Sequence, residues 1–103
     1  MGVVMLEREK RAECVRLARS MGWEVVAIPN NKQSRREIGY RAGAADLVMC
    51  RKGITAFVEM KNAEGKQSKA QEEFQASVGR EGIPYAVIRS AEELEGFLKG
   101  VSA

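Results

Sequence analysis

Two carboxylates and one ammonium group fall within residues 44–62, AADLVMCRKGITAFVEMKN, where a short basic turn joins two apolar runs. Asp46 lies in the first run, Glu59 lies in the second, and Lys61 follows two positions later. If Lys52–Gly53 form a two-residue hairpin turn, Asp46 is paired directly with Glu59. Paired side chains have Cβ atoms about 5 Å apart, and alternation places Lys61 on the same face. The pattern therefore predicts a small group of charged side chains on one face of a hairpin.

Two carboxylates at this separation repel each other, and a bound divalent cation is one way to keep both ionised. Mg²⁺ prefers oxygen ligands and is usually bound by one or two carboxylates together with water and phosphate oxygens. Such a cation would polarise a phosphodiester and lower the pKa of a water, while Lys61 would orient that water or stabilise negative charge. The simpler interpretation is that both acids lie on the solvent-facing side of a half-covered sheet.

The first predicted helix offers a third carboxylate. At about 100° per residue, Glu7 projects close to the direction of Cys14 and Met21, in line with the apolar stripe. We expect Glu7 to reach the sheet as a third metal ligand, unless the start of the helix is frayed. Glu13, at the edge of the stripe, is the alternative acid on this helix.

The composition excludes several kinds of chemistry. The chain has 103 residues and no histidine, which excludes Ser–His and Cys–His nucleophiles and histidine metal ligands within one chain. Cys14 and Cys50 lie in apolar segments without metal-type spacing, and we expect both to be buried, reduced thiols. Catalysis would depend on carboxylates, lysine, tyrosine or a metal held by oxygen atoms, and we expect no organic cofactor.

Positive charge is concentrated in residues 29–43, which contain a single acid, Glu37, in a chain of net charge +3. Arginine and lysine contacts to phosphate give salt-dependent affinity with little sequence information, so we expect this segment to bind DNA, with Tyr40 available for stacking. Its basic residues are Lys32, Arg35, Arg36 and Arg41. The basic residues of the first helix either extend this surface or are ordinary surface charge: Arg8, Lys10, Arg11, Arg16 and Arg19.

Apolar spacing, caps and turn residues predict one domain, 1–103, of class α/β with a small mixed sheet flanked by helices. A strand, a helix and a strand in succession imply a parallel crossover, and the order is αβββαβ plus a C-terminal helix. Ser68 and Gln71 form a capping-box pattern at the start of the second helix. The predicted helices are 4–21, 68–79 and 91–99, and the predicted strands are 23–28, 45–51, 54–61 and 84–89.

The order of motifs resembles the VRR-NUC nucleases, a branch of the PD-(D/E)xK restriction-endonuclease-like superfamily. The resemblance rests on an early glutamate, GAAD before the hairpin, EMK at its end, the helix start GKQSKAQ and the closing VIRSAEELEGFL. The family's usual Gly-x-Pro-Asp is Gly-Ala-Ala-Asp here, a change that alters the strand entry and removes no ligand. Gln67 stands where an apolar residue is expected.

The resemblance implies a restriction-endonuclease-like fold and a Mg²⁺- or Mn²⁺-dependent endonuclease acting on structured DNA. Glu7, Asp46 and Glu59 match the metal-binding acids, and Lys61 matches the catalytic lysine. Gln71 matches a motif glutamine that would position Lys61 or phosphate, in addition to its capping role. Stand-alone members of this size are expected to act as homodimers on four-way (Holliday) junctions, because two symmetric cuts need two active centres.

Three other functions stay open at this point: a nuclease for flaps or single strands, a catalytically inactive nucleic-acid-binding module on the same fold, and an ordinary α/β interaction protein. No apolar run is long enough to cross a membrane, and the first ten residues lack a signal peptide's apolar stretch. We therefore expect a cytoplasmic protein of a bacterial or phage-infected host cell, with no membrane partner.

Overall fold

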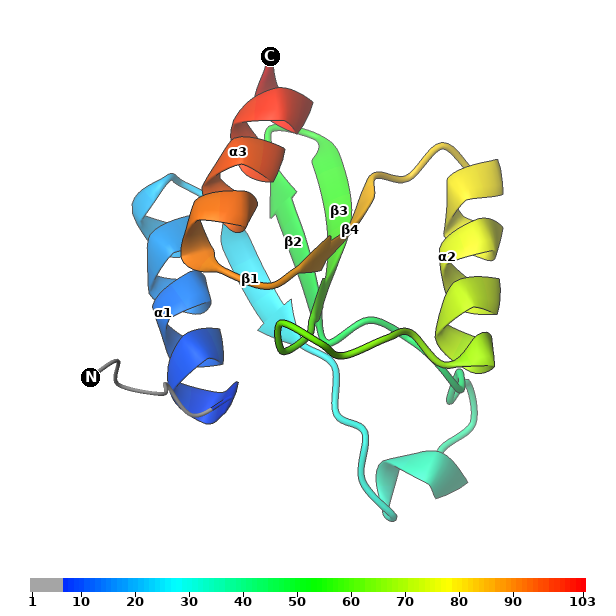
Figure 1. Ribbon diagram of the computed structural model, residues 1–103. Helices are drawn as coiled ribbons and strands as arrows, with labels where there is room; N and C mark the ends of the chain where they lie inside the picture. Colours follow the sequence, from blue (N-terminus) through cyan, green and yellow to red (C-terminus); the bar gives the residue numbers. More distant parts are fainter. Residues whose placement is uncertain (1–6) are drawn as a thin grey trace, which may run out of the picture.

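A four-stranded mixed sheet forms the centre of the protein in a computed structural model, which describes residues 7–103 (Figure 1). Strands β1, β2 and β3 are antiparallel neighbours, and β4 pairs with β3 in parallel after the crossover through α2. This is the predicted element order. The helices are α1 (Glu7–Ser20), α2 (Lys69–Arg80) and α3 (Ala91–Ser102), with a short 3-10 helix, η1 (Ser34–Arg36). The strands are β1 (Glu24–Ala27), β2 (Leu47–Arg51), β3 (Ile54–Met60) and β4 (Tyr85–Ile88).

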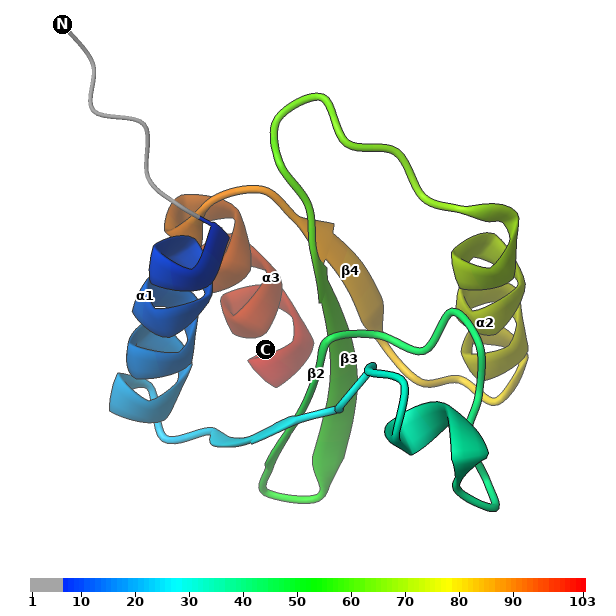
Figure 2. The same cartoon turned by 90° about the horizontal axis from the view of Figure 1, so that it is seen from below.

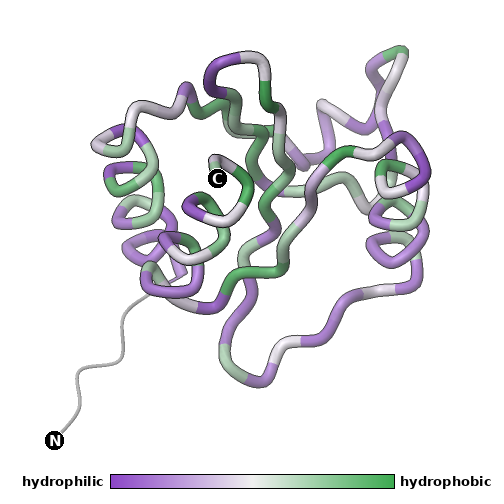
Figure 3. Tube along the Cα trace, turned by 90° about the horizontal axis from the view of Figure 1, so that it is seen from above, coloured by the Kyte–Doolittle hydropathy of each residue, from purple (hydrophilic) through white to green (hydrophobic). Residues whose placement is uncertain are grey.

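Helices α1 and α3 cover one face of the sheet, whereas α2 lies against the other (Figures 1 and 2). The main core lies between the sheet and the α1–α3 layer, where apolar side chains of alternate strand positions meet the inner faces of both helices. Hydrophobic residues accordingly concentrate along the strands, and hydrophilic residues on the outer turns of the helices (Figure 3). The fully buried core residues include Cys14, Ala18, Leu47, Met49, Val58, Leu94 and Leu98.

The β2–β3 hairpin has the predicted register. Leu47 pairs with Val58 and Arg51 pairs with Ile54, so Lys52–Gly53 form the two-residue turn. The φ values of Lys52 (50°) and Gly53 (83°) are both positive, as a type I′ turn requires. The turn fixes which residues face each other along the whole hairpin, including the position of Glu59.

Some boundaries and one burial prediction differ from the structure. Residues 4–6 of the first predicted helix lie outside the described residues, and the last helix continues to Ser102. The prediction that both cysteines are buried is wrong, because Cys14 is buried but Cys50 is exposed. Cys50 follows Met49, which is buried against α1 and α3, so alternation turns its side chain to the face that carries α2. No helix among residues 7–103 is long and apolar enough to cross a lipid bilayer.

Candidate functional site

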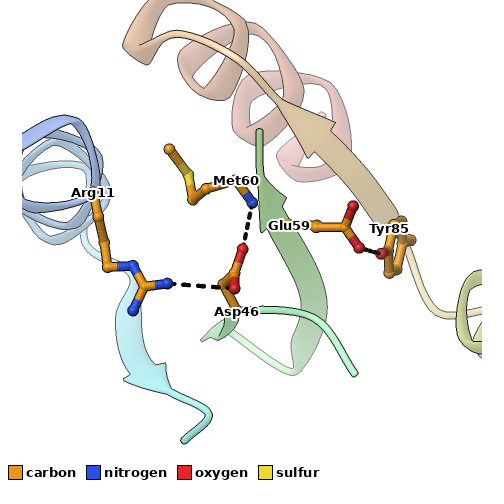
Figure 4. A network of polar contacts seen from close by, with 5 residues as sticks. All are labelled: Arg11, Asp46, Glu59, Met60 and Tyr85. Carbon is orange, nitrogen blue, oxygen red and sulfur yellow. Dashed lines mark hydrogen bonds and ion pairs between the residues drawn. The ribbon is translucent and has the colours of Figure 1, made fainter. Parts of the chain in front are cut away.

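The predicted acids lie at the end of the sheet where β3 finishes and β2 begins (Figure 4). Glu59 is the second-last residue of β3, and Asp46 immediately precedes β2. Strand alternation turns Ala56, Val58 and Met60 towards the core and Glu59 to the opposite face. The register of the hairpin therefore brings both acidic positions to one end of the sheet.

Glu59 is fully buried, with 0% of its surface exposed. The interpretation of this residue as part of a solvent-facing sheet is therefore wrong. Its Oε1 atom accepts a hydrogen bond of 2.6 Å from the hydroxyl of Tyr85 on β4. Its Oε2 atom is buried and has no hydrogen-bond partner within the described part of the chain. A buried carboxylate oxygen without a donor is costly, and such atoms in native proteins usually meet a ligand, water or ion.

Tyr85 links Glu59 to a short chain of polar side chains. The Gln67 amide donates to the Tyr85 hydroxyl at 3.5 Å and to Gln75 Oε1 at 3.0 Å. Burial, followed by the hydrogen bond to the Glu59 carboxylate, raises the pKa of Tyr85 above its usual value. The hydroxyl therefore keeps its proton and stays a donor to Glu59. Gln67, which stands where an apolar residue was expected, is the polar partner of this tyrosine.

The raised pKa of Tyr85 predicts a loss of stability in alkali. The unfolded chain releases the tyrosine proton above about pH 10, whereas the folded chain retains it. The contribution of protonated Tyr85 to the free energy of unfolding is therefore complete below about pH 10 and is lost as the pH rises further. Urea unfolding at about pH 9 and about pH 11 should show a smaller loss for Tyr85→Phe than for the native protein. Equal losses in the two proteins would contradict a protonated Tyr85.

Asp46 is satisfied by different partners. Its Oδ2 accepts a hydrogen bond of 2.7 Å from the Met60 amide, and its Oδ1 lies 3.3 Å from Nη2 of Arg11 on α1 (Figure 4). Glu59 points away from Asp46 towards Tyr85. The expectation that the two carboxylates face each other is therefore wrong, although their register is as predicted. The reason is that the pairing of β2 with β3 ends at Leu47 and Val58, so the Met60 amide, two residues beyond Val58, is free to bind the Asp46 side chain.

Glu7 and Lys61, the other predicted site residues near these acids in the sequence motif, lie at the start of α1 and directly after β3. Glu7 is exposed and lines a shallow hollow with Arg8 and Arg11. The Lys61 amide donates to the Ile88 carbonyl at 3.0 Å, and its side chain is partly exposed. No three acidic or cysteine side chains among residues 7–103 come together closely enough to hold a metal ion. The structure thus does not join Glu7, or its alternative Glu13, to Asp46 and Glu59.

Gln71 forms the predicted capping box at the start of α2. Its Oε1 accepts from the Ser68 amide at 2.8 Å, and its own amide donates to Ser68 Oγ at 3.2 Å. This arrangement satisfies two of the free amides at the helix start. The capping role expected from the sequence is confirmed, and the predicted role of Gln71 towards Lys61 or phosphate stays a prediction.

A divalent cation fits the chemistry of the acidic pair. Glu59 Oε2 is a buried carboxylate oxygen without a donor among residues 7–103, and Asp46 presents a second carboxylate close to the same strand end. Oxygen donors of this kind suit Mg²⁺ or Mn²⁺. Glu59 and Asp46 are the side chains that would hold such a cation, while Arg11 supplies the positive charge beside Asp46 in its absence.

The position of Arg11 leads to a prediction about metal affinity. The Arg11 and Asp46 side chains are 39% and 30% exposed, so their ion pair contributes at most about 1 kcal/mol to stability. Because the guanidinium occupies an oxygen that a cation would use, Arg11→Gln should tighten Mn²⁺ binding by up to about fivefold. Calorimetry would measure this change against Arg16→Gln, which alters an exposed arginine on the same helix. Weaker binding by Arg11→Gln would show that Arg11 supports the site instead of competing with the cation.

Two residues that the sequence did not single out order the site. Tyr85 holds Glu59, and Arg89, directly after β4, holds the loop that follows Lys61. The Arg89 guanidinium donates to the carbonyls of Asn62, Ala63 and Gly65, with 2.8 Å to the last. Both residues follow the α2 crossover and are far from the hairpin in sequence. Apolar spacing, which predicts strands and helices, does not indicate where the tyrosine hydroxyl or the arginine guanidinium will bind.

The predicted DNA-binding residues lie on the α2 side of the sheet. Lys32, Arg35 and Arg36 are exposed, with the two arginines in η1. Arg41 is also exposed, and its guanidinium lies 5.8 Å from the centre of the Phe74 ring on α2. Figure 2 shows η1 beside α2. The loop therefore presents its basic side chains to solvent next to a helix that it contacts.

The chain has the restriction-endonuclease-like fold of VRR_NUC domains. One solved structure, described as "VRR_NUC domain", matches 90% of this chain and 94% of its own with a TM-score of 0.72 and 19% identity. Another, described as "VRR_NUC domain protein", matches 95% of this chain and 89% of its own with a TM-score of 0.69 and 15% identity. No protein-family model and no curated protein matches the amino-acid sequence significantly. The comparisons confirm the predicted fold and leave the site residues to the geometry described above.

Proposed function

We propose that this protein is a Mg²⁺- or Mn²⁺-dependent endonuclease that cuts structured DNA, with a four-way junction as its substrate. The observation that carries the proposal is the buried Glu59 Oε2, which lacks a donor among the residues described, in a fold shared with VRR_NUC domains. A purely structural acid at this position would be expected to satisfy both oxygens. The nearby Asp46 and Lys61 add the second carboxylate and the cationic side chain that phosphodiester hydrolysis needs.

Each residue has a distinct part in the proposed reaction. A bound divalent cation supplies polarisation of the phosphodiester and charge stabilisation. Asp46 and Glu59 hold that cation, and Tyr85 fixes one oxygen of Glu59. Lys61 directs the attacking water or stabilises the negative charge on phosphorus. Glu7 and Gln71 stay proposed contributors, as a further acid and as a residue that positions Lys61 or phosphate.

Cleavage of a synthetic four-way junction in Mg²⁺ or Mn²⁺ tests the proposal directly. Asp46→Asn keeps the shape of the side chain but removes the charge, so cleavage should fall by at least about a hundredfold. Glu64→Gln, an exposed acid in the loop after Lys61, is the matched control and should cut normally. Chelation with EDTA should stop cleavage by the native protein. Equal cutting by Asp46→Asn and the native protein would exclude Asp46 from the reaction.

An inactive nucleic-acid-binding module is the second candidate function. It is favoured by the Arg11–Asp46 ion pair at 3.3 Å, which neutralises Asp46 without any metal. Calorimetry with Mn²⁺ separates the two functions, since a module would bind DNA in a salt-dependent way and show no Mn²⁺ binding. The endonuclease should bind Mn²⁺, and this binding should be lost in Asp46→Asn.

Symmetric cutting of a four-way junction needs two active centres, so we propose that the protein acts as a homodimer. Two-fold dimers are the commonest oligomers, and each chain carries one pair of these acids, Asp46 and Glu59. Sedimentation equilibrium should show a dimer for the protein alone and two chains bound to each junction when junction DNA is added. A complex containing one chain would restrict the activity to a single cut.

A further inference from the structure

A largely apolar hollow of about 380 Å³ lies between the basic loop and the α2 side of the sheet. Aromatic rings form much of its wall: Tyr40 comes from the loop, Phe57 from β3 and Phe74 from α2. Phe57 and Phe74 meet edge to face with their centres 5.1 Å apart, so this part of the wall is rigidly packed. The Tyr40 hydroxyl donates to Asn30 Oδ1 at 3.2 Å, which holds its ring at the rim.

The same rim exposes apolar surface to solvent. Of the residues that the structure describes, Val26, Ile38 and Tyr40 are the large hydrophobic side chains that stand out as exposed. Ile38 and Tyr40 both belong to the loop at the hollow, and Ile38 is fully exposed. Apolar side chains gathered at the mouth of a cavity usually mark a ligand-binding surface.

Charge complementarity restricts the ligand. The loop that supplies Tyr40 also carries Lys32, Arg35 and Arg36, all exposed, outside the lining of the hollow. The charged residues that line the hollow are Glu37 and Arg41, whose guanidinium lies over the Phe74 ring, so the basic residues of the loop outnumber its one acid. A ligand that matches this surface must combine negative charge with a flat apolar group. Nucleic acid has both, but the faces of its bases are accessible only where a base has left the stack.

The hollow adjoins the acidic strand end. Phe57 and Glu59 lie two residues apart on the same face of β3, a separation of about 7 Å along the strand. Ala44, which also lines the hollow, precedes Asp46 by two residues. A base in the hollow would therefore place its own backbone, or that of the adjacent nucleotide, beside Asp46 and Glu59.

We propose that the hollow binds an unpaired nucleobase, so that the substrate class is DNA with a nucleotide displaced from the stack next to the cleaved bond. This inference rests on the proposed nuclease function and makes it more specific. The aromatic rings would stack on the base, and the loop arginines would hold its flanking phosphates. Fully paired duplex would lack the group that fills the hollow.

The test compares two short DNA duplexes of the same sequence, one with a single unpaired 2-aminopurine and one with the 2-aminopurine paired to thymine. Fluorescence anisotropy in EDTA measures the affinity for each, with no metal available for cleavage. Because a base stacked on an aromatic ring contributes about 1–3 kcal/mol, the native protein should prefer the unpaired form by about five- to a hundredfold. Tyr40→Ser should reduce this preference several-fold, whereas Tyr40→Phe should retain it.

Matched variants separate the hollow from general DNA binding. Arg35→Gln should weaken binding to both duplexes by the same factor, because it removes a phosphate contact. Val26→Ser removes an exposed apolar residue on β1 that does not line the hollow, and it should leave the preference unchanged. Circular dichroism tests whether each variant folds. We expect the Tyr40 variants to fold because this side chain is exposed.

Loss of the preference in Tyr40→Ser, with its retention in Tyr40→Phe and Val26→Ser, supports the hollow as the base site. A native protein that binds both duplexes equally, or a preference that survives Tyr40→Ser, overturns it. The binding assay needs no cleavage, so failure of the nuclease proposal would leave this result standing. Conversely, metal-dependent cutting without any preference for the unpaired base would overturn the proposed base site and leave the nuclease proposal intact.

Discussion

Glu59→Gln should make the metal-free protein more stable and should remove its response to Mn²⁺. In the native chain the carboxylate is 0% exposed, and its Oε2 has no donor among residues 7–103. A buried charged oxygen without a partner typically costs about 1–3 kcal/mol or more, and glutamine has nearly the same shape without the charge. The free energy of unfolding without metal should therefore rise by about 1–2 kcal/mol.

The same substitution should abolish the proposed activity. A cation that binds the folded state only raises its stability by mass action, so Mn²⁺ should increase the melting temperature of the native protein. Glu59→Gln should show no such increase, and cleavage should fall by at least about a hundredfold, since even changes to residues around metal ligands cost 10- to 100-fold. Thermal unfolding with and without Mn²⁺ measures the first effect and junction cleavage measures the second, with Glu64→Gln as the exposed control.

A less stable Glu59→Gln would contradict this account, because it would mean that the buried carboxylate oxygen costs less than the buried amide group that replaces it. An equal Mn²⁺ response in both proteins would place the cation elsewhere. The two results are independent, since the change in stability reports the cost of the buried carboxylate and the Mn²⁺ response reports whether that carboxylate binds the cation.

Gly43→Ala should destabilise the protein strongly and displace the loop that leads into Asp46. Gly43 has φ of +80°, and a methyl group added there would overlap the carbonyl of Ala70 at the start of α2. Left-handed backbone costs a non-glycine residue about 1–2 kcal/mol, and the overlap requires the loop or the helix start to move. We therefore expect a total loss of about 2–4 kcal/mol in urea unfolding.

Gly39→Ala is the matched control for this experiment. Gly39 has a similar φ of +92°, but nothing lies within 4 Å of the added methyl group. Its loss should be restricted to about 1–2 kcal/mol of backbone strain. Equal losses for the two variants would show that the close approach to Ala70 has no energetic importance. Reduced cleavage by Gly43→Ala alone would link the position of this loop to the acidic site.

The sequence predicted the features that depend on near neighbours. Lys52–Gly53 defined the turn, the turn defined the register, and the register placed Glu59 at the strand end opposite Asp46. The Ser68–Gln71 capping box was equally local. Each of these predictions needed only the geometry of a turn, a strand or a helix start, and such geometry is fixed by the types of a few adjacent residues.

The features that the sequence did not predict depend on packing between distant elements. Glu59 is buried because the face that carries it also carries α2 and the aromatic rings of Phe57 and Tyr85, and no spacing within β3 indicates that cover. Asp46 forms an ion pair with Arg11, which lies on α1, a helix far from Asp46 in the sequence. Cys50 is exposed because that cover does not reach it.

Strand β4 has a consequence for the order in which the protein is made. Tyr85, the first residue of this strand, supplies the hydroxyl that holds Glu59. Arg89, directly after the strand, supplies the guanidinium that holds the loop after Lys61. A ribosome therefore produces the whole acidic hairpin before either restraint exists. The hydrogen bonds that order Glu59 and this loop can therefore form only after the final quarter of the chain has emerged and β4 has paired with β3.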